Sequence, residues 1–265
     1  MRTFLINLKS AVDRKKRMTA QLNSLGISFE LFEAVYGKEL PIETAAKYYD
    51  MDFYHKRQKS YTAGSVGCAL SHFFIYEKIV KEKIPVAFLL EDDMELTEDL
   101  PQVLDAIENK IRKDEIIMIY YQSFTELELI QPEAEILYTQ YQLFPLVNLK
   151  GLTCTGAYCI TYDVAKRFID KLPPLTTFAD DWLKFYDKNC FDLMRVVYPF
   201  AINNAYLPSD ITPYQGKYKI VSDLLNFFNQ KKVFPFYQVL KWKRKISYAK
   251  TRICKIVDKQ KAYYR

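Results

Sequence analysis

The chain has 265 residues, enough to bury a substantial core without disulfides or a structural metal. Hydrophobic residues make up 49% of it and charged residues 26%, a composition that excludes intrinsic disorder. The net charge of +6 is uneven, because residues 231–265 alone carry twelve Lys/Arg and one acid, a local charge of +11. The rest of the chain therefore sums to −5, and the basic character belongs to the C-terminal tail.

Cysteine use and hydropathy point to a cytoplasmic protein with reduced thiols. None of the five cysteines forms a CxxC pair and only two histidines are present, so a structural zinc site is not expected. The start, MRTFLINLKS, meets a charge within ten residues, which is not typical of a signal peptide. No run approaches the roughly 18 apolar residues of a membrane-spanning helix.

The first ninety residues alternate strand and helix patterns. The predicted order is strand Thr3–Leu8, helix Lys9–Gly26, strand Ser28–Val35, helix Ser65–Lys83 and strand Val86–Leu90, with loops or short helices over 37–62. The last of these strands is continuously apolar, as in buried parallel sheets.

The alternation continues to about residue 200. The predicted elements are helix Thr97–Arg112, strand Glu115–Tyr121, strand Ala157–Thr161, helix Asp163–Leu172, a helical stretch opening at Ala179-Asp180-Asp181, and strand Met194–Tyr198. This pattern predicts the α/β class: an open, mostly parallel sheet flanked by helices. We expect one catalytic domain over 1–215 and a basic helical tail over 216–265.

The tail has an amphipathic pattern. Trp242, Ile246, Ile253 and Val257 are spaced 4, 7 and 4 residues apart, on one face of a helix whose other faces are basic. A basic helix with Trp on its apolar side is typical of contact with an anionic membrane surface, which we expect for 231–265. The alternative is a helix packed on the domain. Nucleic acid is not expected as a partner, because the main domain is net acidic and offers no basic groove.

Three consecutive acids, Glu91, Asp92 and Asp93, follow the apolar strand Val86–Leu90 directly. Ligands of open α/β sheets bind at the carboxyl ends of the strands, where these acids are expected. Adjacent carboxylates repel one another, and Mg²⁺ or Mn²⁺ would relieve that repulsion. Glu91 and Asp93, two residues apart, can point to one side and bind the ion. The alternative is a solvated acidic turn.

Four stretches then indicate a family: FLINLKSAVDRKKRM, FELFEAVYGKEL, GSVGCALSHFFIYEKI with VAFLLEDDMEL, and GAYCITYDVAKRFID with FADDW. They run in order across residues 4–182, and the combination GxxGCxxSH with LEDD is the specific part. In these stretches the chain resembles bacterial members of glycosyltransferase family 25, which include lipooligosaccharide galactosyl- and glucosyltransferases. The resemblance implies a GT-A domain, a metal on a DxD-like motif, and inversion at the anomeric carbon.

On the donor side, the resemblance implies that Mn²⁺ (or Mg²⁺) on Glu91 and Asp93 faces the diphosphate of a UDP-sugar. Because Glu stands where a strict DxD has Asp, Asp92 with Asp93 is the alternative pair, and Asp210 is a weak candidate for a third ligand. The residues expected to bind the donor are Asn7, Arg14, Ser71, His72 and Asp92. Alternatively Arg14 is an exposed helix arginine and His72 a packed one, while Cys68 is expected to pack as a small hydrophobe.

On the acceptor side, an inverting transfer needs one general base. We expect Asp181 as the base and Asp180 as an acceptor-binding residue, with the reverse order open and an ordinary N-cap pair as the alternative. Thr155, Gly156 and Tyr158 are expected to line this side. For Tyr158 a core position is the alternative.

The resulting hypothesis is a metal-dependent, inverting β-1,4-galactosyltransferase. It would transfer galactose from UDP-galactose to a lipooligosaccharide or lipopolysaccharide core, a glycolipid acceptor at the inner face of the cytoplasmic membrane. The alternatives are a glucosyltransferase of the same family, a two-carboxylate glycoside hydrolase, and a membrane adaptor that binds no nucleotide.

Overall fold

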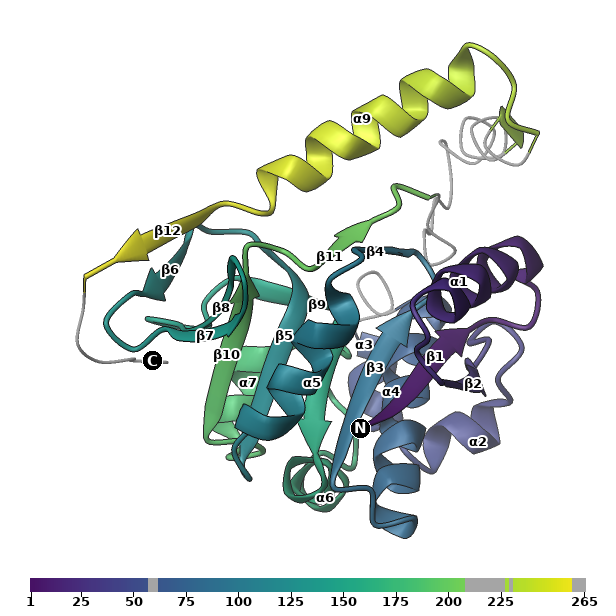
Figure 1. Cartoon of the computed structure of the whole chain (residues 1–265). Helices are drawn as coiled ribbons and strands as arrows, with labels where there is room; N and C mark the ends of the chain where they lie inside the picture. The colour runs from purple at the N-terminus through teal and green to yellow at the C-terminus, as the bar shows by residue number, and fades with distance from the viewer. Residues whose placement is uncertain (57–61, 208–226, 229–230, 259–265) are drawn as a thin grey trace.

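The computed structural model describes residues 1–56, 62–207, 227–228 and 231–258. Its centre is an eight-stranded open sheet with helices on both faces (Figure 1), which confirms the predicted fold class. The strands lie in the order β2 (Glu30–Glu33), β1 (Arg2–Asn7), β3 (Val86–Glu91), β9 (Leu152–Thr161), β5 (Glu115–Ser123), β10 (Leu193–Tyr198), β8 (Tyr141–Pro145) and β7 (Glu135–Tyr138).

Strand direction determines which side chains meet at the edge of the sheet. Strand β1 is parallel to both β2 and β3, and β10 is parallel to β5. Strand β9 lies between β3 and β5 and is antiparallel to both, with Leu90 opposite Ala157. The carboxyl ends of β1 and β3 therefore share one edge with the beginning of β9. Residues from three separate parts of the sequence meet there.

Two apolar layers hold the helices on the sheet. On one face, α1 (Val12–Ser24) and α5 (Leu100–Lys110) pack through residues such as Met18 and Val103, both fully buried. On the other face lie α4 (Ala63–Lys81), α6 (Tyr162–Lys171) and α7 (Trp182–Asp187). Burying apolar surface at about 25 cal/mol per Å² is the main force that fixes these helices.

The remaining elements are short. Residues 37–56 contain α2 (Ile42–Ala46) and α3 (Met51–Lys56), as expected for that polar region. Two small sheets were not predicted: β4 (Met94–Leu96) pairs with β11 (Ile202–Asn204), and β6 (Leu127–Ile130) pairs with β12 (Cys254–Val257). Strands of three or four residues carry too little alternation to be recognised from the sequence.

The tail contains the predicted basic helix, α9 (Phe236–Lys250), but this helix is shorter than the pattern indicated. The expectation that Ile253 and Val257 continue its apolar face is wrong, because β12 begins at Cys254. The backbone after the helix finds partners in the domain: the amide of Ser123 donates to the carbonyl of Thr251 at 2.7 Å, and that of Leu127 to the carbonyl of Ile253 at 3.0 Å. Main-chain groups in such ladders outweigh the helical pattern of the side chains.

The predicted domain boundary at residue 215 lies outside the described residues. Among the residues that are described, no helix is both long and apolar enough to cross a membrane.

Candidate active site

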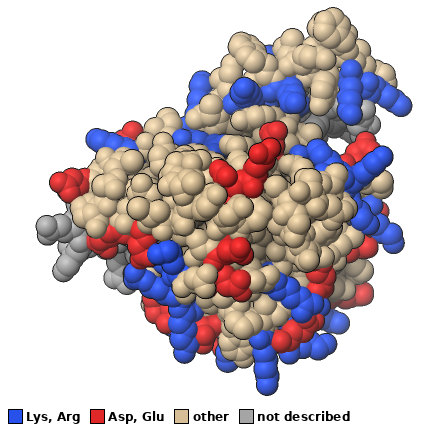
Figure 2. All heavy atoms as spheres, viewed as in Figure 1, with Lys and Arg blue, Asp and Glu red and all other residues tan. Residues whose placement is uncertain are grey.

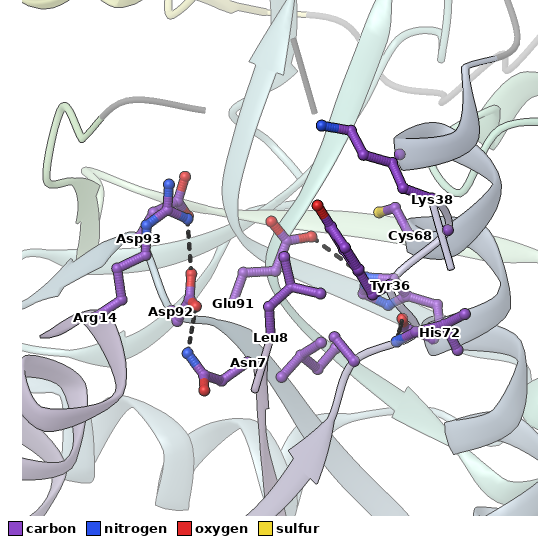
Figure 3. A pocket seen from close by; sticks show the side chains of 16 residues that line it. Asn7, Leu8, Arg14, Tyr36, Lys38, Cys68, His72, Glu91, Asp92 and Asp93 are labelled. Atoms are coloured by element: carbon purple, nitrogen blue, oxygen red, sulfur yellow. Dashed lines mark hydrogen bonds and ion pairs between the residues drawn. The ribbon is translucent and has the colours of Figure 1, made fainter. Parts of the chain in front are cut away.

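A cavity of about 120 Å³, open to solvent at its mouth, lies at the carboxyl ends of β1 and β3. Figure 3 shows Asn7 and Arg14 around Asp92, with Glu91 directed toward His72. Residues from β1, α1, β3, α4 and the segment after β2 line it, among them Asn7, Arg14, Tyr36, Lys38, Cys68, Ser71, His72, Glu91, Asp92 and Asp93. The acidic motif and four of the predicted donor-binding residues are therefore neighbours in space.

Two glycines bring the segment after β2 close to α4. A Cβ on Gly37 would lie 1.7 Å from the carbonyl oxygen of Ala63, and one on Gly67 would lie 2.4 Å from that of Val35. Ser71 completes this junction, because its hydroxyl accepts from the amide of Val35 at 2.8 Å and donates to the carbonyl of Gly67 at 2.7 Å. Close backbone packing at this junction forms the cavity wall.

Asp92 is bound by the protein itself. Asn7 Nδ2 donates to its Oδ2 at 2.6 Å, and Arg14 Nη1 donates to its Oδ1 at 3.0 Å. Arg17 Nη2 also donates to the carbonyl oxygens of Asp92 and Met94, at 2.9 and 2.7 Å. Burial raises the pKa of Asp92, against the opposing effect of the Arg14 charge. The turn that carries the acidic motif is thus tied to both β1 and α1.

Glu91 faces α4 and β9. Its Oε1 accepts from Thr155 Oγ1 at 2.6 Å and lies 3.3 Å from His72 Nε2. Burial alone would raise the pKa of Glu91, but the hydrogen bond and charge of His72, with Thr155 and Arg14, hold it below its ordinary value. Glu91 is therefore held as a carboxylate.

His72 is oriented from behind by a buried tyrosine. Tyr158 is fully buried, and its hydroxyl lies 2.8 Å from His72 Nδ1 and 2.6 Å from the hydroxyl of Tyr76. The rings of His72 and Tyr158 stack with centroids 5.7 Å apart. The contacts at Nδ1 and the ring stacking direct Nε2 at Glu91.

Asp93 is the member of the motif with an unsatisfied oxygen. Its Oδ1 is buried and has no hydrogen-bond partner among the residues that the structure describes. Burial and the nearby charge of Glu91 raise the pKa of Asp93 to about 7. An unpaired buried carboxylate oxygen is costly, and Mg²⁺ or Mn²⁺ prefers such oxygen ligands. Glu91 and Asp93 therefore fit the divalent cation that the acidic motif predicts.

A second set of potential ligands shares Glu91. Cys68, His72 and Glu91 bring one ligand atom each to within 4.8 Å of one another. A sulfur ligand suits Zn²⁺ better than Mn²⁺, and burial raises the pKa of the Cys68 thiol well above its usual value. The carboxylate oxygens of Glu91 and Asp93 therefore suit Mg²⁺ or Mn²⁺ better than the set with Cys68 does.

The two candidate bases have different surroundings. Asp180 Oδ2 accepts from the Thr153 hydroxyl, and from the amide of Cys154 at 2.9 Å, at the beginning of β9. Asp181 Oδ2 accepts instead from the amide of Phe178 at 3.0 Å and pairs with exposed Lys184 at 2.8 Å. The negative charge of Asp180 acts on the same Cys68 thiol as that of Glu91. Asp180 is thus on the side of the acidic motif.

The three predicted acceptor-side residues are placed differently. Thr155 contacts Glu91 directly. Gly156 packs in the core, where a Cβ would come within 2.7 Å of the Tyr120 ring. Tyr158 takes its alternative position in the core, and its contact with His72 gives it a part in the geometry of the site.

Comparison with known proteins agrees with this arrangement. The family model described as "Glycosyltransferase family 25 (LPS biosynthesis protein)" matches residues 1–183, more than half of the chain. The chain belongs to glycosyltransferase family 25. The matched residues include the whole cavity and both candidate bases, whereas α9 and β12 lie outside them.

Relatives within family 25 come from bacteria and animals. Lacto-N-neotetraose biosynthesis glycosyltransferase LgtE of Neisseria gonorrhoeae is 26% identical over 206 residues, which cover 74% of this chain and 71% of that protein. Procollagen galactosyltransferase 1-B of Xenopus laevis is 41% identical over 99 residues, 34% of this chain and only 16% of that protein. The solved inositol-1-phosphate CTP transferase of T. maritima has a TM-score of 0.34 at 16% identity, covering 74% and 84% of the two chains, too low to support an inference.

Three residues at the family 25 site were not predicted as functional. Tyr36 and Lys38 line the cavity, and Cys68, which was expected only to pack, lines it too. The first two come one and three residues after the predicted strand Ser28–Val35, which places them at the same edge as the acidic motif, and that signal could have found them. Asp210, the weak candidate for a third ligand, lies outside the described residues.

Proposed function

We propose that the protein is a metal-dependent, inverting glycosyltransferase of the GT-A type that transfers galactose from UDP-galactose. The observation that carries the proposal is the buried Asp93 Oδ1, which has no hydrogen-bond partner among the described residues, in a cavity at the carboxyl edge of the sheet that Glu91 also lines. Family membership and the names of the galactosyltransferase relatives support the sugar and the reaction.

Glu91 and Asp93 would hold Mn²⁺ or Mg²⁺. The cation, when bound, would neutralise negative charge on the UDP leaving group. The chain's own residues fix the two carboxylates: His72 and Thr155 hold Glu91, and the contacts of Asp92 hold the turn that contains Asp93. Such outer contacts orient metal ligands and tune their affinity.

The UDP moiety would occupy the cavity between β1 and α4. Lys38 reaches toward it from the helix side (Figure 3), where an ammonium group would attract the diphosphate. The Tyr36 ring offers a flat apolar surface for the uracil. Arg14 would act in part through Asp92, to which it is bonded.

We propose Asp180 as the general base, the reverse of the order that the sequence favoured. The two hydrogen bonds that Asp180 makes with described residues both use Oδ2, so Oδ1 stands outside them. Asp180 would take the proton of the acceptor hydroxyl as that oxygen bonds to the anomeric carbon and the bond from this carbon to UDP breaks. Asp181 would anchor the start of α7.

The acceptor we propose is a lipooligosaccharide or lipopolysaccharide core, joined in a β-1,4 linkage at the inner face of the cytoplasmic membrane. Support comes from the family description and from the LgtE relative. UDP-glucose is the alternative donor, because sugar selection depends on one or two side chains that face a hydroxyl group.

The test is UDP release from a panel of UDP-sugars with Mn²⁺ and a lipooligosaccharide acceptor. We expect the fastest release from UDP-galactose, and a loss of at least about a hundredfold in Asp93→Asn. Asp105→Asn, an exposed acid on α5, is the matched control and should retain full activity. Background release from every donor, with no rise in Tm from UDP plus Mn²⁺, would contradict the proposal.

A further inference from the structure

The inner face of helix α9 packs on the segment that follows β11. Tyr237, Leu240, Arg244 and Tyr248, spaced 3, 4 and 4 residues apart, are its partly buried residues. Arg244 Nε donates to the carbonyl of Tyr206 at 2.7 Å, and the rings of Tyr248 and Tyr206 meet edge to face at 5.8 Å. The inner face of the helix is therefore fixed on the segment that follows β11.

That segment lies directly against Asp93. The amide of Ala205, next to Tyr206, donates to the carbonyl of Asp93 at 2.8 Å. The charges of Asp93 and Glu91 also act on Tyr248, where burial first and then these charges raise the pKa to about 12. In Figure 1, α9 crosses above the edge toward which β1 and β3 point. Helix α9 is thus held near the carboxyl edge of the sheet, where the site lies.

The outer face of α9 is apolar and open to solvent. Phe236, Val239, Trp242 and Ile246 are 50%, 46%, 62% and 38% exposed. At about 100° per residue these positions fall in one arc of roughly 120°, on the side opposite Arg244 and Tyr248. Exposed apolar residues gathered on one side of a helix in this way mark an interaction surface.

Charge identifies the partner. The helix carries five Lys/Arg and no acid. At 100° per residue, exposed Lys241 and Lys245 lie beyond the Trp242 edge of this arc, and exposed Lys243 and Lys250 fall within it near the Phe236 edge. Figure 2 shows blue side chains on both sides of tan atoms in this part of the molecule. Apolar residues between lysines match the interface of an anionic phospholipid leaflet. A second copy of the same face would bring like charges together.

We propose that the outer face of α9, formed by Phe236, Val239, Trp242 and Ile246, docks on an anionic phospholipid leaflet and turns the mouth of the acidic site toward it. The evidence for docking comes from α9 alone and does not depend on the proposed function. Its purpose rests on the proposed function, because an acceptor sugar on a lipid would enter the site from the leaflet that α9 contacts. The helix, outside the residues matched by the family, would thereby select membrane-borne acceptors.

The test is co-flotation of the full chain with vesicles of phosphatidylcholine and phosphatidylglycerol, in low and high salt, beside vesicles of phosphatidylcholine alone. We expect binding only to the anionic vesicles, weakened by salt, with a blue shift of Trp fluorescence from Trp242, since Trp182 is already buried. Val239→Glu with Ile246→Glu should reduce partitioning at least about tenfold.

Val12→Glu with Ile42→Glu is the matched control, since these residues are 65% and 70% exposed elsewhere on the domain. This control should bind as the wild type does, and circular dichroism should show all three proteins folded. The proposal is overturned if the wild type does not float with anionic vesicles, or if the α9 variant floats equally well. It is also overturned if light scattering shows that the wild type is a dimer and the α9 variant a monomer.

A second arm separates docking from catalysis. UDP release is measured with intact lipooligosaccharide in the vesicles and with its delipidated core. The α9 variant should match the wild type on the delipidated core and fall at least about tenfold on the vesicles. Flotation without UDP release from any donor would leave docking standing while the proposed function fails. Equal loss on both acceptors would refute the role in acceptor selection.

Discussion

Asn7 and Asp92 lie 85 positions apart in the sequence, and Asn7 Nδ2 donates to Asp92 Oδ2 at 2.6 Å. The same amide nitrogen lies 3.2 Å from the carbonyl of Ala11, so it joins the ends of β1 and β3 to the start of α1. Arg14 binds the other carboxylate oxygen of Asp92. Both carboxylate oxygens of Asp92 are thus used in hydrogen bonds that hold the turn to β1 and α1. This leaves Glu91 and Asp93 as the pair that we propose for the metal.

Replacing Asp92 with Ala should therefore destabilise the protein. Asn7 and Arg14 each lose a hydrogen bond in a part-buried site, and we expect the free energy of unfolding to fall by about 1–2 kcal/mol. Urea denaturation measures the change. The control Asp105→Ala, on the exposed side of α5, should stay within about 0.5 kcal/mol of the wild type. Equal free energies of unfolding for the two variants would contradict a stabilising role of the Asp92 side chain.

The position of this site could be predicted from the sequence. Asn7 ends one apolar run and Glu91 follows another, and parallel strands place their carboxyl ends at one edge. The contact between His72 and Tyr158 could not be predicted from the sequence, because it depends on β9 lying antiparallel beside β3. Neither the direction of a strand nor its neighbour is encoded in its own hydrophobic pattern.

Two other features of the chain depend on contacts that the sequence does not show. Asp180 and Asp181 are adjacent and chemically alike, and their spacing does not reveal that the first contacts Thr153 and Cys154 and the second Phe178 and Lys184. The residues after Lys250 have a helical pattern, yet their backbone pairs with β6, more than a hundred residues earlier. Local spacing does not reveal a distant edge strand.

Tyr158→Phe should weaken metal binding without unfolding the protein. The ring would still fill its place in the core, but His72 Nδ1 would lose its partner and Nε2 would hold Glu91 less firmly. We expect the Kd for Mn²⁺ to rise about tenfold, as for other outer contacts of metal ligands. Isothermal titration calorimetry tests this against Tyr121→Phe, an equally buried tyrosine bonded elsewhere, which should leave the Kd unchanged. A similar rise in both variants would point to general loosening.

In metal-free protein, the stability contributed by Asp93 should fall as pH rises. Burial and the charge of Glu91 raise its pKa from 3.8 to about 7, so between about pH 4 and 7 the folded chain retains a proton that the unfolded chain has lost. Unfolding then releases a proton, and its free energy decreases with pH across that window. With a chelator present, Asp93→Asn should gain Tm relative to the wild type by several degrees between pH 5 and pH 8. A constant Tm difference would show that Asp93 titrates normally.

Variants of the two adjacent acids, Asp180 and Asp181, should differ in kcat. If Asp180 is the base, Asp180→Asn removes the proton acceptor while the amide can still accept from Thr153, so kcat should fall by about 10²–10⁴ with little change in Tm. Asp181→Asn weakens the contacts to Phe178 and Lys184, so it should lower Tm slightly and leave kcat within about threefold of the wild type. Steady-state UDP release and thermal melting of both variants, at saturating donor and Mn²⁺, decide between them. The opposite pattern, with kcat lost only in Asp181→Asn, would assign the base to Asp181 and leave Asp180 as a support of β9.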